Sequence, residues 1–509
     1  MAISRSGGST VTRPFSRRPH GFERPPRGSR LASALVIAVL APSLASPPTA
    51  VRHSGSWGSA LEMPGSVGLN YGVVRLGSSE VPSVNAISCP SANNCSAGGE
   101  YTDRAGHGQA FVVDDVGGHW QSAIEVPESA ALNAGGHAEI NSVSCASAGN
   151  CAAGGDFATS SGGLEAMVVD EVGGVWAPAI EVPATEVLNS YGDASVVSMS
   201  CTSPGYCSAG GFYTDRDGSQ AFVVDEVAGI WGMAQEIPGI LNTGGNAQVR
   251  SLSCAAPGDC SAGGYYATGR SGFGAFVVNE TNGVWSRAEA VPNSAHLDTG
   301  HLAGLDLVSC SGIGICSAVG DYLTVTDGRS VEQPFVVTES DGVWGPAASM
   351  LLPYRLIAAG RVDATALSCA IPGKCTVGGD YWNKNDNWHV FAESQVNGTW
   401  REAAEIPGTG PLNAGNNAQV NSVSCGAGGY CAAAGYVTTA RRTQQAFVVL
   451  ETQNVWHAAQ ILPNSQRLNT GGAAEVGAVS CTPSGFCAAG GDYTARGGSQ
   501  QLFVAAFQP

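Results

Sequence analysis

Sixteen cysteines stand in this chain as eight pairs of one spacing, with five residues between the two members of each pair. First cysteines of successive pairs are 56, 56, 53, 56, 59, 56 and 56 residues apart, so one unit is repeated eight times. The pairs are Cys89 and Cys95, Cys145 and Cys151, Cys201 and Cys207, Cys254 and Cys260, Cys310 and Cys316, Cys369 and Cys375, Cys425 and Cys431, and Cys481 and Cys487. Such a chain folds by setting neighbouring copies side by side, because one copy alone cannot bury its apolar face.

Each copy carries the pattern of four β-strands. In the second copy we expect strands at 140–145, from 151 onward, at 166–172 and at 176–183, where short Val/Ile/Ala-rich runs are bounded by turn residues. The glycine pair at 173–174 is a hairpin signal between the third and fourth strands. The sequence therefore predicts antiparallel strands joined by tight turns.

Four antiparallel strands repeated eight times predict an all-β, eight-bladed β-propeller. A β-solenoid is the alternative, but it needs caps, whereas a propeller closes on itself. The last copy stops after its third strand, and the missing piece stands at the other end: "WGSALEMPGSVGLN" (57–70) matches "WQSAIEVPESAALN" (120–133). We therefore predict that the N-terminal strand completes the last blade.

The N-terminal segment has the pattern of a secretory signal peptide. Seven arginines and one acid in the first thirty residues precede an apolar run at 31–45 that ends in small residues. Because this run is shorter than the roughly twenty residues of a membrane span, we expect cleavage before Ser46. The predicted organisation is a signal peptide at 1–45, a short segment at 46–56 and the propeller at 57–509; the export route, general or twin-arginine, stays open.

The charge balance limits the classes of partner that the protein can bind. The whole chain has 24 basic and 41 acidic side chains, and removing the signal peptide leaves 17 and 40, a net charge near −23. Such a surface repels phosphate backbones and anionic lipids, so we expect neither nucleic acid nor a membrane as partner. The sequence favours a secreted, extracellular or wall-associated monomer.

All sixteen cysteines are predicted to form eight hairpin disulfides, because an even number behind a signal peptide indicates oxidation. We expect neither a metal site nor a cofactor, since no histidine recurs with the pairs. The serines of "SVSC" and the glycine four residues after each second cysteine are expected to let crowded inner strands approach. The fourth-strand tryptophans are expected to form a ring of wedges between blades.

The repeat resembles secreted bacterial propellers with a turn-then-tryptophan motif, such as the Asp-box (BNR) group that includes sialidases. The Asp-box aspartate stands five residues before the tryptophan, a place held here by Asp115 and then by Glu171 and other mostly acidic residues. Its serine and threonine are mostly absent, so no sialidase active site is carried over. The repeat also resembles bacterial exported proteins of "SVSC" repeats, a resemblance that implies a fold and a compartment but no activity.

One loop departs from the repeat and supplies the candidate site. In the sixth copy "DYWNKNDNWHVF" (380–391) adds Trp382 and Trp388, the two tryptophans outside the ring. Two aromatic faces with Asn385, Asp386 and His389 around them suit stacking on a sugar ring. The alternative is that the tryptophans pack the hairpin as a cross-strand pair.

The leading hypothesis from the sequence is a binding or scaffold module for carbohydrate or a cell-surface protein. The asparagines of the "LNxGG" connections, Asn133 among them, could form repeated sugar sites, but we expect each to close its own turn. The alternative function is a polysaccharide-acting glycoside hydrolase or lyase with a carboxylate pair at the channel mouth. The common motifs of hydrolases, metalloproteases and nucleotide-binding loops are absent from the sequence, and no catalytic residue is predicted.

Overall fold

The computed structural model describes residues 55–71, 82–239, 242–269, 272–326, 329–353, 356, 361–385 and 387–509. The predicted signal peptide and residues 46–54 lie outside these ranges. Within them, no helix has the length and apolarity that crossing a bilayer requires.

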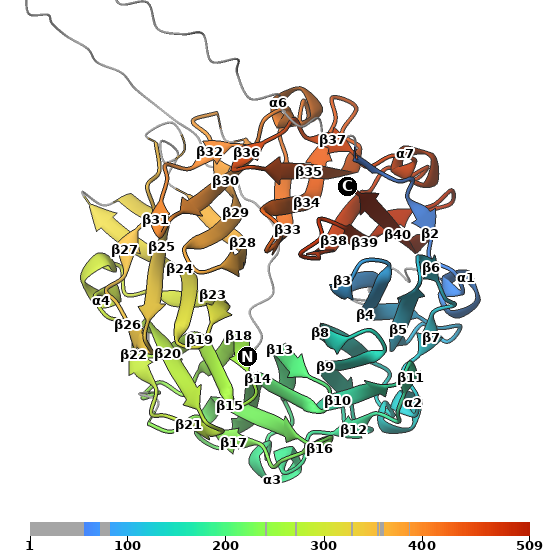
Figure 1. Cartoon of the computed structure of the whole chain (residues 1–509). Coiled ribbons are helices and arrows are strands. Elements are labelled where there is room, and N and C mark those ends of the chain that lie inside the picture. The colour runs from blue at the N-terminus through green and yellow to red at the C-terminus, as the bar shows by residue number, and fades with distance from the viewer. Residues whose placement is uncertain are drawn as a thin grey trace, which may run out of the picture. The chain divides into compact units, whose positions relative to one another are not determined.

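Eight antiparallel sheets, one for each cysteine repeat, are arranged around a common axis (Figure 1), as the sequence predicts. Each sheet has three long strands, counted outward from the axis. They are β3 (Ser83–Ser91), β4 (Asn94–Thr102) and β5 (Gly108–Val116) in blade 1; β8 (Ala138–Ser147), β9 (Asn150–Ala158) and β10 (Leu164–Val172) in blade 2; β13 (Ser195–Ser203), β14 (Tyr206–Asp215) and β15 (Gly218–Val227) in blade 3; and β18 (Ala247–Ala256), β19 (Asp259–Ala267) and β20 (Phe273–Thr281) in blade 4. The other four blades hold β23 (Gly304–Gly312), β24 (Ile315–Thr326) and β25 (Arg329–Ser340) in blade 5; β28 (Val362–Ile371), β29 (Lys374–Trp382) and β30 (Trp388–Val396) in blade 6; β33 (Ala418–Gly426), β34 (Tyr430–Thr438) and β35 (Gln444–Thr452) in blade 7; and β38 (Ala474–Cys481), β39 (Cys487–Thr494) and β40 (Gln500–Gln508) in blade 8.

The outer, fourth position of each blade is held by two short strands instead of one continuous strand. Both pair with the third strand of the blade, and the chain leaves the ladder between them. The pairs are β6 (His119–Trp120) and β7 (Ile124–Glu125), β11 (Val175–Trp176) and β12 (Ile180–Glu181), β16 (Ile230–Trp231) and β17 (Gln235–Glu236), β21 (Val284–Trp285) and β22 (Glu289–Ala290), β26 (Val343–Trp344) and β27 (Ala348–Ser349), β31 (Thr399–Trp400) and β32 (Ala404–Glu405), and β36 (Val455–Trp456) and β37 (Gln460–Ile461).

The ring closes as the sequence predicts. In blade 8 the outer position is held by β1 (Ser56–Trp57) and β2 (Leu61–Glu62), which pair antiparallel with β40. Figure 1 shows this N-terminal segment in blue against the red C-terminal strand. Trp57 is 4% exposed and its ring centroid lies 5.8 Å from that of Phe507. The two ends of the folded domain are thus held in one sheet.

Short helices follow the outer strands of most blades and were not predicted, because four residues are too few for a helical period. Each begins after a residue with positive φ, and in five of the six helices given below the first hydroxyl bonds back to the chain, as Ser66 Oγ does to the Met63 carbonyl at 2.7 Å; Ser129 Oγ is the exception. They are α1 (Ser66–Leu69), α2 (Ser129–Leu132), α3 (Thr185–Leu188), α4 (Ser294–Leu297), α6 (Thr409–Leu412) and α7 (Ser465–Leu468).

The eight predicted disulfides are all present and join the first two strands of each blade. Cys145 and Cys151 are directly opposite in the ladder between β8 and β9. A few residues further along, the register shifts by one at a β-bulge between Ile140 and Ser142. A Cβ on Gly155 would lie 1.9 Å from the Glu139 carbonyl oxygen, so this close approach requires glycine, as the sequence predicts.

Serine joins the blades into a closed ring of hydrogen bonds. The hydroxyl before each first cysteine accepts the backbone N–H of the next blade's first cysteine; for example, Cys201 N donates to Ser144 Oγ at 2.8 Å. The same bond occurs at all eight junctions, including Cys89 N to Ser480 Oγ at 3.0 Å, which links blade 1 to blade 8. Small size alone was the sequence-based reason for these serines, and hydrogen bonding between blades adds a second one.

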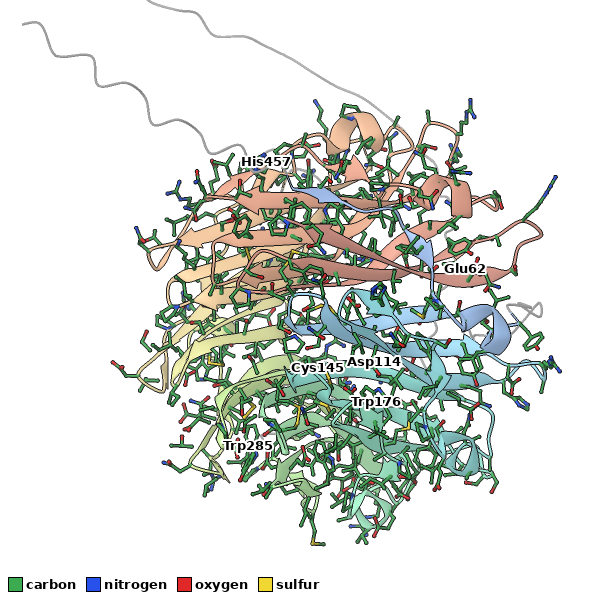
Figure 2. All side chains as sticks on the ribbon, turned by 45° about the vertical axis from the view of Figure 1, so that its right-hand side comes forward. Glu62, Asp114, Cys145, Trp176, Trp285 and His457 are labelled. Carbon is green, nitrogen blue, oxygen red and sulfur yellow. A yellow bond between two sulfur atoms is a disulfide. The ribbon has the colours of Figure 1, made fainter. Side chains whose placement is uncertain are left out.

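The fourth-strand tryptophans pack between blades, as expected. Trp231 of blade 3, for instance, belongs to a buried cluster with Ala152 and Val168 of blade 2. Its indole N–H donates to Asp170 of blade 2 at 3.0 Å, and Trp176 does the same to Asp114 of blade 1. Figure 2 labels Trp176 and Asp114 at this junction. The apolar core thus lies mainly between the sheets.

Candidate functional site at the loop rim

The two edges of the propeller differ in kind. One edge, here called the disulfide rim, carries the cysteine hairpin turns and the turns after the third strands, which meet where Gly174 N donates to the Gly149 carbonyl at 2.9 Å. The opposite edge, the loop rim, carries the loops between second and third strands and the "LNxGG" connections, joined by bonds such as Gly108 N to the Gly136 carbonyl at 3.1 Å. Loop edges commonly carry the functional residues of a rigid scaffold.

Three carboxyl pairs stand at the loop-rim ends of the two innermost strands. In each pair an acid of the first strand is directly opposite an acid of the second strand; the pairs are Glu139 and Asp156 in blade 2, Asp363 and Asp380 in blade 6, and Glu475 and Asp492 in blade 8. Like charges directly opposite in an antiparallel ladder are destabilising. Paired acids at a common position are therefore candidates for a binding or chemical role.

Burial changes the acidity of these groups. Burial, with the nearby Asp363 carboxylate as a second cause, raises the pKa of Asp380 to about 8. Burial and the charge of Glu475 raise the pKa of Asp492 well above its ordinary value. One member of each of these two pairs therefore holds its proton far more readily than an exposed aspartic acid.

The three pairs differ in the residue two positions before their first acid. Blade 6 has Arg361, whose Nε donates to Asp363 Oδ2 at 2.9 Å and lies 3.4 Å from Glu332 of blade 5. Blade 2 has His137, whose Nε2 lies 3.3 Å from Asp156 Oδ1. Blade 8 has Ala473 at this place. The carboxyl pair therefore has an arginine next to it in blade 6 and a histidine in blade 2, whereas blade 8 has an alanine at this position.

The junction of blades 5 and 6 brings several charged side chains together at the loop rim. Asp321 of blade 5 is half-buried with its Oδ1 enclosed, and desolvation together with the charges of Asp306, Asp363 and Glu332 raises its pKa well above the ordinary value. Arg361 opposes this effect. The junction of blades 5 and 6 is therefore a strongly acidic region organised around one arginine.

The hairpin between β29 and β30 borders this region and holds the predicted tryptophans. Trp382 and Trp388 are directly opposite in the ladder, and their rings stack with centroids 5.3 Å apart at 22°. This is the cross-strand pair that the sequence left open as an alternative to a binding surface. Both rings are half-buried, and the Arg361 guanidinium carbon lies 5.6 Å from the Trp388 ring centroid.

The polar residues of this hairpin have different places. Asn385 is exposed, and Asp386 lies outside the described residues. His389 is half-buried, stacks on Tyr381 with centroids 5.5 Å apart, and contacts Glu405 through Nδ1 at 3.4 Å. Its Nε2 lies 2.8 Å from Asn383 Nδ2, so His389 is a fixed element of the hairpin.

The "LNxGG" asparagines are internal, as expected. Asn133 is 6% exposed; its Oδ1 accepts the N–H groups of Gly136 and His137, and its Nδ2 donates to the Gly108 carbonyl at 3.0 Å. Asn189, Asn242, Asn413 and Asn469 bond in the same manner. These side chains close turns instead of facing a ligand.

The disulfide rim has a second set of acidic crevices between neighbouring blades. A cavity of about 630 Å³ lies between blades 1 and 2, and one of about 240 Å³ lies between blades 2 and 3. Another of about 240 Å³ lies between blades 3 and 4, and one of about 420 Å³ lies between blades 4 and 5. Three of them pair an aspartate of one blade with a glutamate of the next: Asp114 with Glu171, Asp170 with Glu226, and Asp225 with Glu280. In each pair burial, and then the aspartate charge, raises the pKa of the glutamate, to about 7, 7 and 8 respectively.

Sequence reasoning identified the blade 6 tryptophans but none of the carboxyl pairs. The signal was present, because the two acids of each loop-rim pair are 17 residues apart in all three blades (156 − 139, 380 − 363, 492 − 475). The sequence gives little signal for Arg361. It is a charged residue at a position where the other copies have different residues.

Comparisons with known proteins assign this chain to no family. No protein-family model and no curated protein matches the chain. Among solved structures, Sqt1 of Chaetomium thermophilum matches at 12% identity and a TM-score of 0.46, over 84% of this chain and 95% of that one. A polysaccharide lyase of family PL25, an ulvan lyase, matches at 10% identity and 0.40, over 80% and 94%. A point mutant of the NanB sialidase of Streptococcus pneumoniae matches at 10% and 0.32, over 70% and 66%. What this chain binds has to be inferred from its own residues.

Proposed function

We propose that this protein is a secreted, disulfide-stapled propeller that binds carbohydrate at the loop rim of blade 6. The observation that carries the proposal is the stacked pair of Trp382 and Trp388 beside Arg361. Half-buried indole rings offer apolar faces to the C–H face of a sugar, while the neighbouring charged groups can bond its hydroxyls.

The tryptophan pair is a departure that the fold does not need. At the same two ladder positions blade 7 has Thr438 opposite Gln444, and blade 8 has Thr494 opposite Gln500. Those blades form the same hairpin without an aromatic residue. Two large apolar side chains at a half-buried rim position are therefore better explained by a ligand than by folding.

Hydrogen bonds hold the backbone of both tryptophans in place without a ligand. Trp382 N donates to the Arg361 carbonyl at 3.0 Å, and Trp388 N donates to the Asn416 carbonyl of the next connection at 3.1 Å. Asn413 Nδ2 donates to the Trp388 carbonyl at 2.8 Å. Preorganised contact groups lose less conformational entropy on binding, which favours affinity.

The charge of the region selects the class of sugar. Glu332 and Asp363 are ion-paired with Arg361, and the chain as a whole is acidic, with a net charge of −17. A sulfated or uronic acid polymer would be repelled. We therefore expect a neutral, hydroxyl-rich glycan.

A glycan array with the mature protein tests this proposal. The matched variant is Trp382→Thr with Trp388→Gln, which rebuilds the pair found in blades 7 and 8 and so preserves the hairpin. We expect the wild type to capture neutral glycans and the double variant to lose at least tenfold in affinity, with an unchanged melting temperature. Equal binding by both proteins, or no capture by the wild type, would overturn the proposal.

A second candidate function is supported by the carboxyl pair in blade 6. Burial raises the pKa of Asp380, which is 5% exposed, to about 8, while Asp363 is ion-paired with Arg361 at 2.9 Å. An acid that holds its proton opposite a second carboxyl group is an arrangement that glycoside hydrolysis uses. A glycoside hydrolase or lyase would release reducing ends from a captured polymer and lose this activity in Asp380→Asn. Capture without release favours the binding module.

A further inference from the structure

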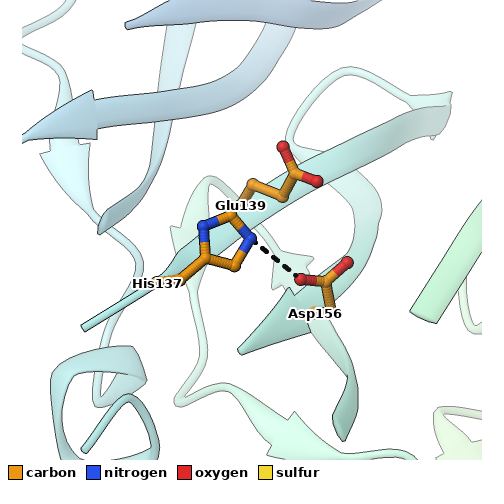
Figure 3. Close-up of side chains that lie close together, drawn as sticks. All are labelled: His137, Glu139 and Asp156. Atoms are coloured by element: carbon orange, nitrogen blue, oxygen red, sulfur yellow. Dashed lines mark ion pairs between the residues drawn. The ribbon is translucent and has the colours of Figure 1, made fainter. Parts of the chain in front are cut away.

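Three side chains of blade 2 converge at the loop rim (Figure 3). His137 precedes β8, Glu139 is in β8 and Asp156 is in β9, and each offers one ligand atom within 4.8 Å of the other two. His137 Nε2 and Asp156 Oδ1 are 3.3 Å apart. The sequence did not predict this group, because its members meet only through the strand register.

Asp156 is held in a way that leaves one oxygen for a ligand. The residue is 3% exposed, and its Oδ2 accepts the Ser195 hydroxyl at 2.6 Å and the Asn141 amide at 3.4 Å. Its Oδ1 is buried, accepts no hydrogen bond and faces His137. A buried carboxylate oxygen without a hydrogen bond is costly, and a cation would remove this cost.

The backbone fixes the imidazole in the same region. His137 N donates to Asn133 Oδ1 at 2.8 Å, and Ala158 N donates to the His137 carbonyl at 2.7 Å. The histidine thus stands at a closed turn beside the carboxyl pair. Hydrogen bonds that orient the ligating groups are a usual feature of metal centres.

The three carboxyl pairs of the loop rim provide an internal comparison. In blade 6 the pair already has a cation in Arg361, and in blade 8 the matching residue is Ala473. Among the described residues, blade 2 alone joins a carboxyl pair to an imidazole in this way. One nitrogen and two carboxylate ligands suit a borderline metal such as zinc, whereas calcium and magnesium prefer oxygen alone.

We propose that blade 2 binds one divalent transition metal ion, with Zn²⁺ as the probe, through His137, Glu139 and Asp156. Zinc–ligand bonds of about 2.0–2.2 Å bring ligand atoms to within about 4 Å of one another, so small side-chain rotations from the present arrangement suffice. Three protein ligands leave a coordination position for water or a substrate oxygen. The site lies four blades away from the blade 6 hairpin, so the metal site and the sugar site can be tested independently.

Isothermal titration of the chelator-treated, full-length mature protein with Zn²⁺ tests the proposal. We expect one ion per chain, at least a hundredfold weaker binding in His137→Ala, and a loss of about tenfold in Ser195→Ala, which removes the hydroxyl that orients Asp156. His137→Ala recreates the alanine of blade 8, so folding should be retained. His457→Ala is the matched control, because this exposed histidine of blade 7 bonds Thr452 at the disulfide rim and should leave binding unchanged.

A second variant and a spectroscopic measurement distinguish loss of the metal site from misfolding of His137→Ala. Glu139→Gln gives blade 2 the glutamine that blades 4 and 7 carry as Gln248 and Gln419, and it should also weaken binding at least tenfold. Co²⁺ should give a visible absorption band with the wild type and not with His137→Ala. Wild-type affinity in both variants, or no uptake of Zn²⁺ or Co²⁺ by the wild type, would overturn the proposal.

Discussion

Replacing Asp225 by asparagine should stabilise the protein at alkaline pH. Asp225 of blade 3 and Glu280 of blade 4 share a crevice at the disulfide rim. Burial first, and then the Asp225 charge, raises the pKa of Glu280 to about 8. At the next junction, between blades 4 and 5, an asparagine already stands at the position of Asp225. This residue, Asn279, donates from Nδ2 to Glu339 Oε1 at 2.5 Å and accepts the Trp344 indole N–H at 2.9 Å.

The sign of the effect follows from the pKa. Because the folded-state pKa of Glu280 lies above its ordinary value of 4.5, its contribution to stability is fully present below that value and is lost as pH rises through about 8. Two unit charges about 4 Å apart interact by about 4 kcal/mol at an effective dielectric constant of 20. Since Asp225 is partly exposed, screening reduces this to about 1–2 kcal/mol.

Urea denaturation of the wild type and Asp225→Asn between pH 5 and pH 9 measures the difference. The variant should match the wild type near pH 5, where Glu280 is protonated, and exceed it by about 1–2 kcal/mol near pH 9. Asparagine keeps an acceptor for the Trp285 indole, which donates to Asp225 at 2.9 Å. The reverse change, Asn279→Asp, should make stability more sensitive to pH. Parallel pH profiles for all three proteins would contradict a charge interaction between Asp225 and Glu280.

The remaining predictions concern the closure of the ring and the compartment. Ser144→Ala removes the acceptor of the Cys201 N–H and should lower the free energy of unfolding by about 1–3 kcal/mol in urea titrations. Trp57→Ala removes a buried side chain that packs on Phe507 and should cost about 3–5 kcal/mol; a change below about 1 kcal/mol would contradict closure by the N-terminal strand. Reduction of the disulfides should lower the melting temperature, since each short loop contributes about 2 kcal/mol, and an unchanged melting curve would contradict this. N-terminal sequencing of exported protein should give Ser46 as the first residue, and a start within the apolar run would contradict the predicted cleavage.

Repetition made most of the fold predictable from the sequence. The cysteine pairs fix the inner hairpin of each blade covalently, and the match between 57–70 and 120–133 reveals ring closure without any structure. The split outer strand and the four-residue helices were missed because elements of two to four residues are too short for a periodic pattern. Contacts between blades, such as the Ser144 bond to Cys201, join residues 57 positions apart and leave no local signal.

The carboxyl pairs escaped prediction for a definite geometric reason. Counting outward from Cys145 and Cys151 in regular register would place Glu139 opposite Phe157. The β-bulge at Asn141 shifts the register by one, so Glu139 is opposite Asp156 instead. A bulge depends on how the blade packs against its neighbour, and here the bulged Asn141 donates to the Val196 carbonyl of blade 3 at 3.1 Å. The tryptophans of blade 6 needed no register, because they stand out by residue type.

Hydrogen–deuterium exchange with and without a captured glycan shows whether a sugar binds at the loop rim of blade 6. We expect added protection on 380–391 and on the segment around Arg361, while the disulfide-rim hairpins exchange as before. Protection confined to the disulfide rim, or spread equally over all eight blades, would contradict this expectation.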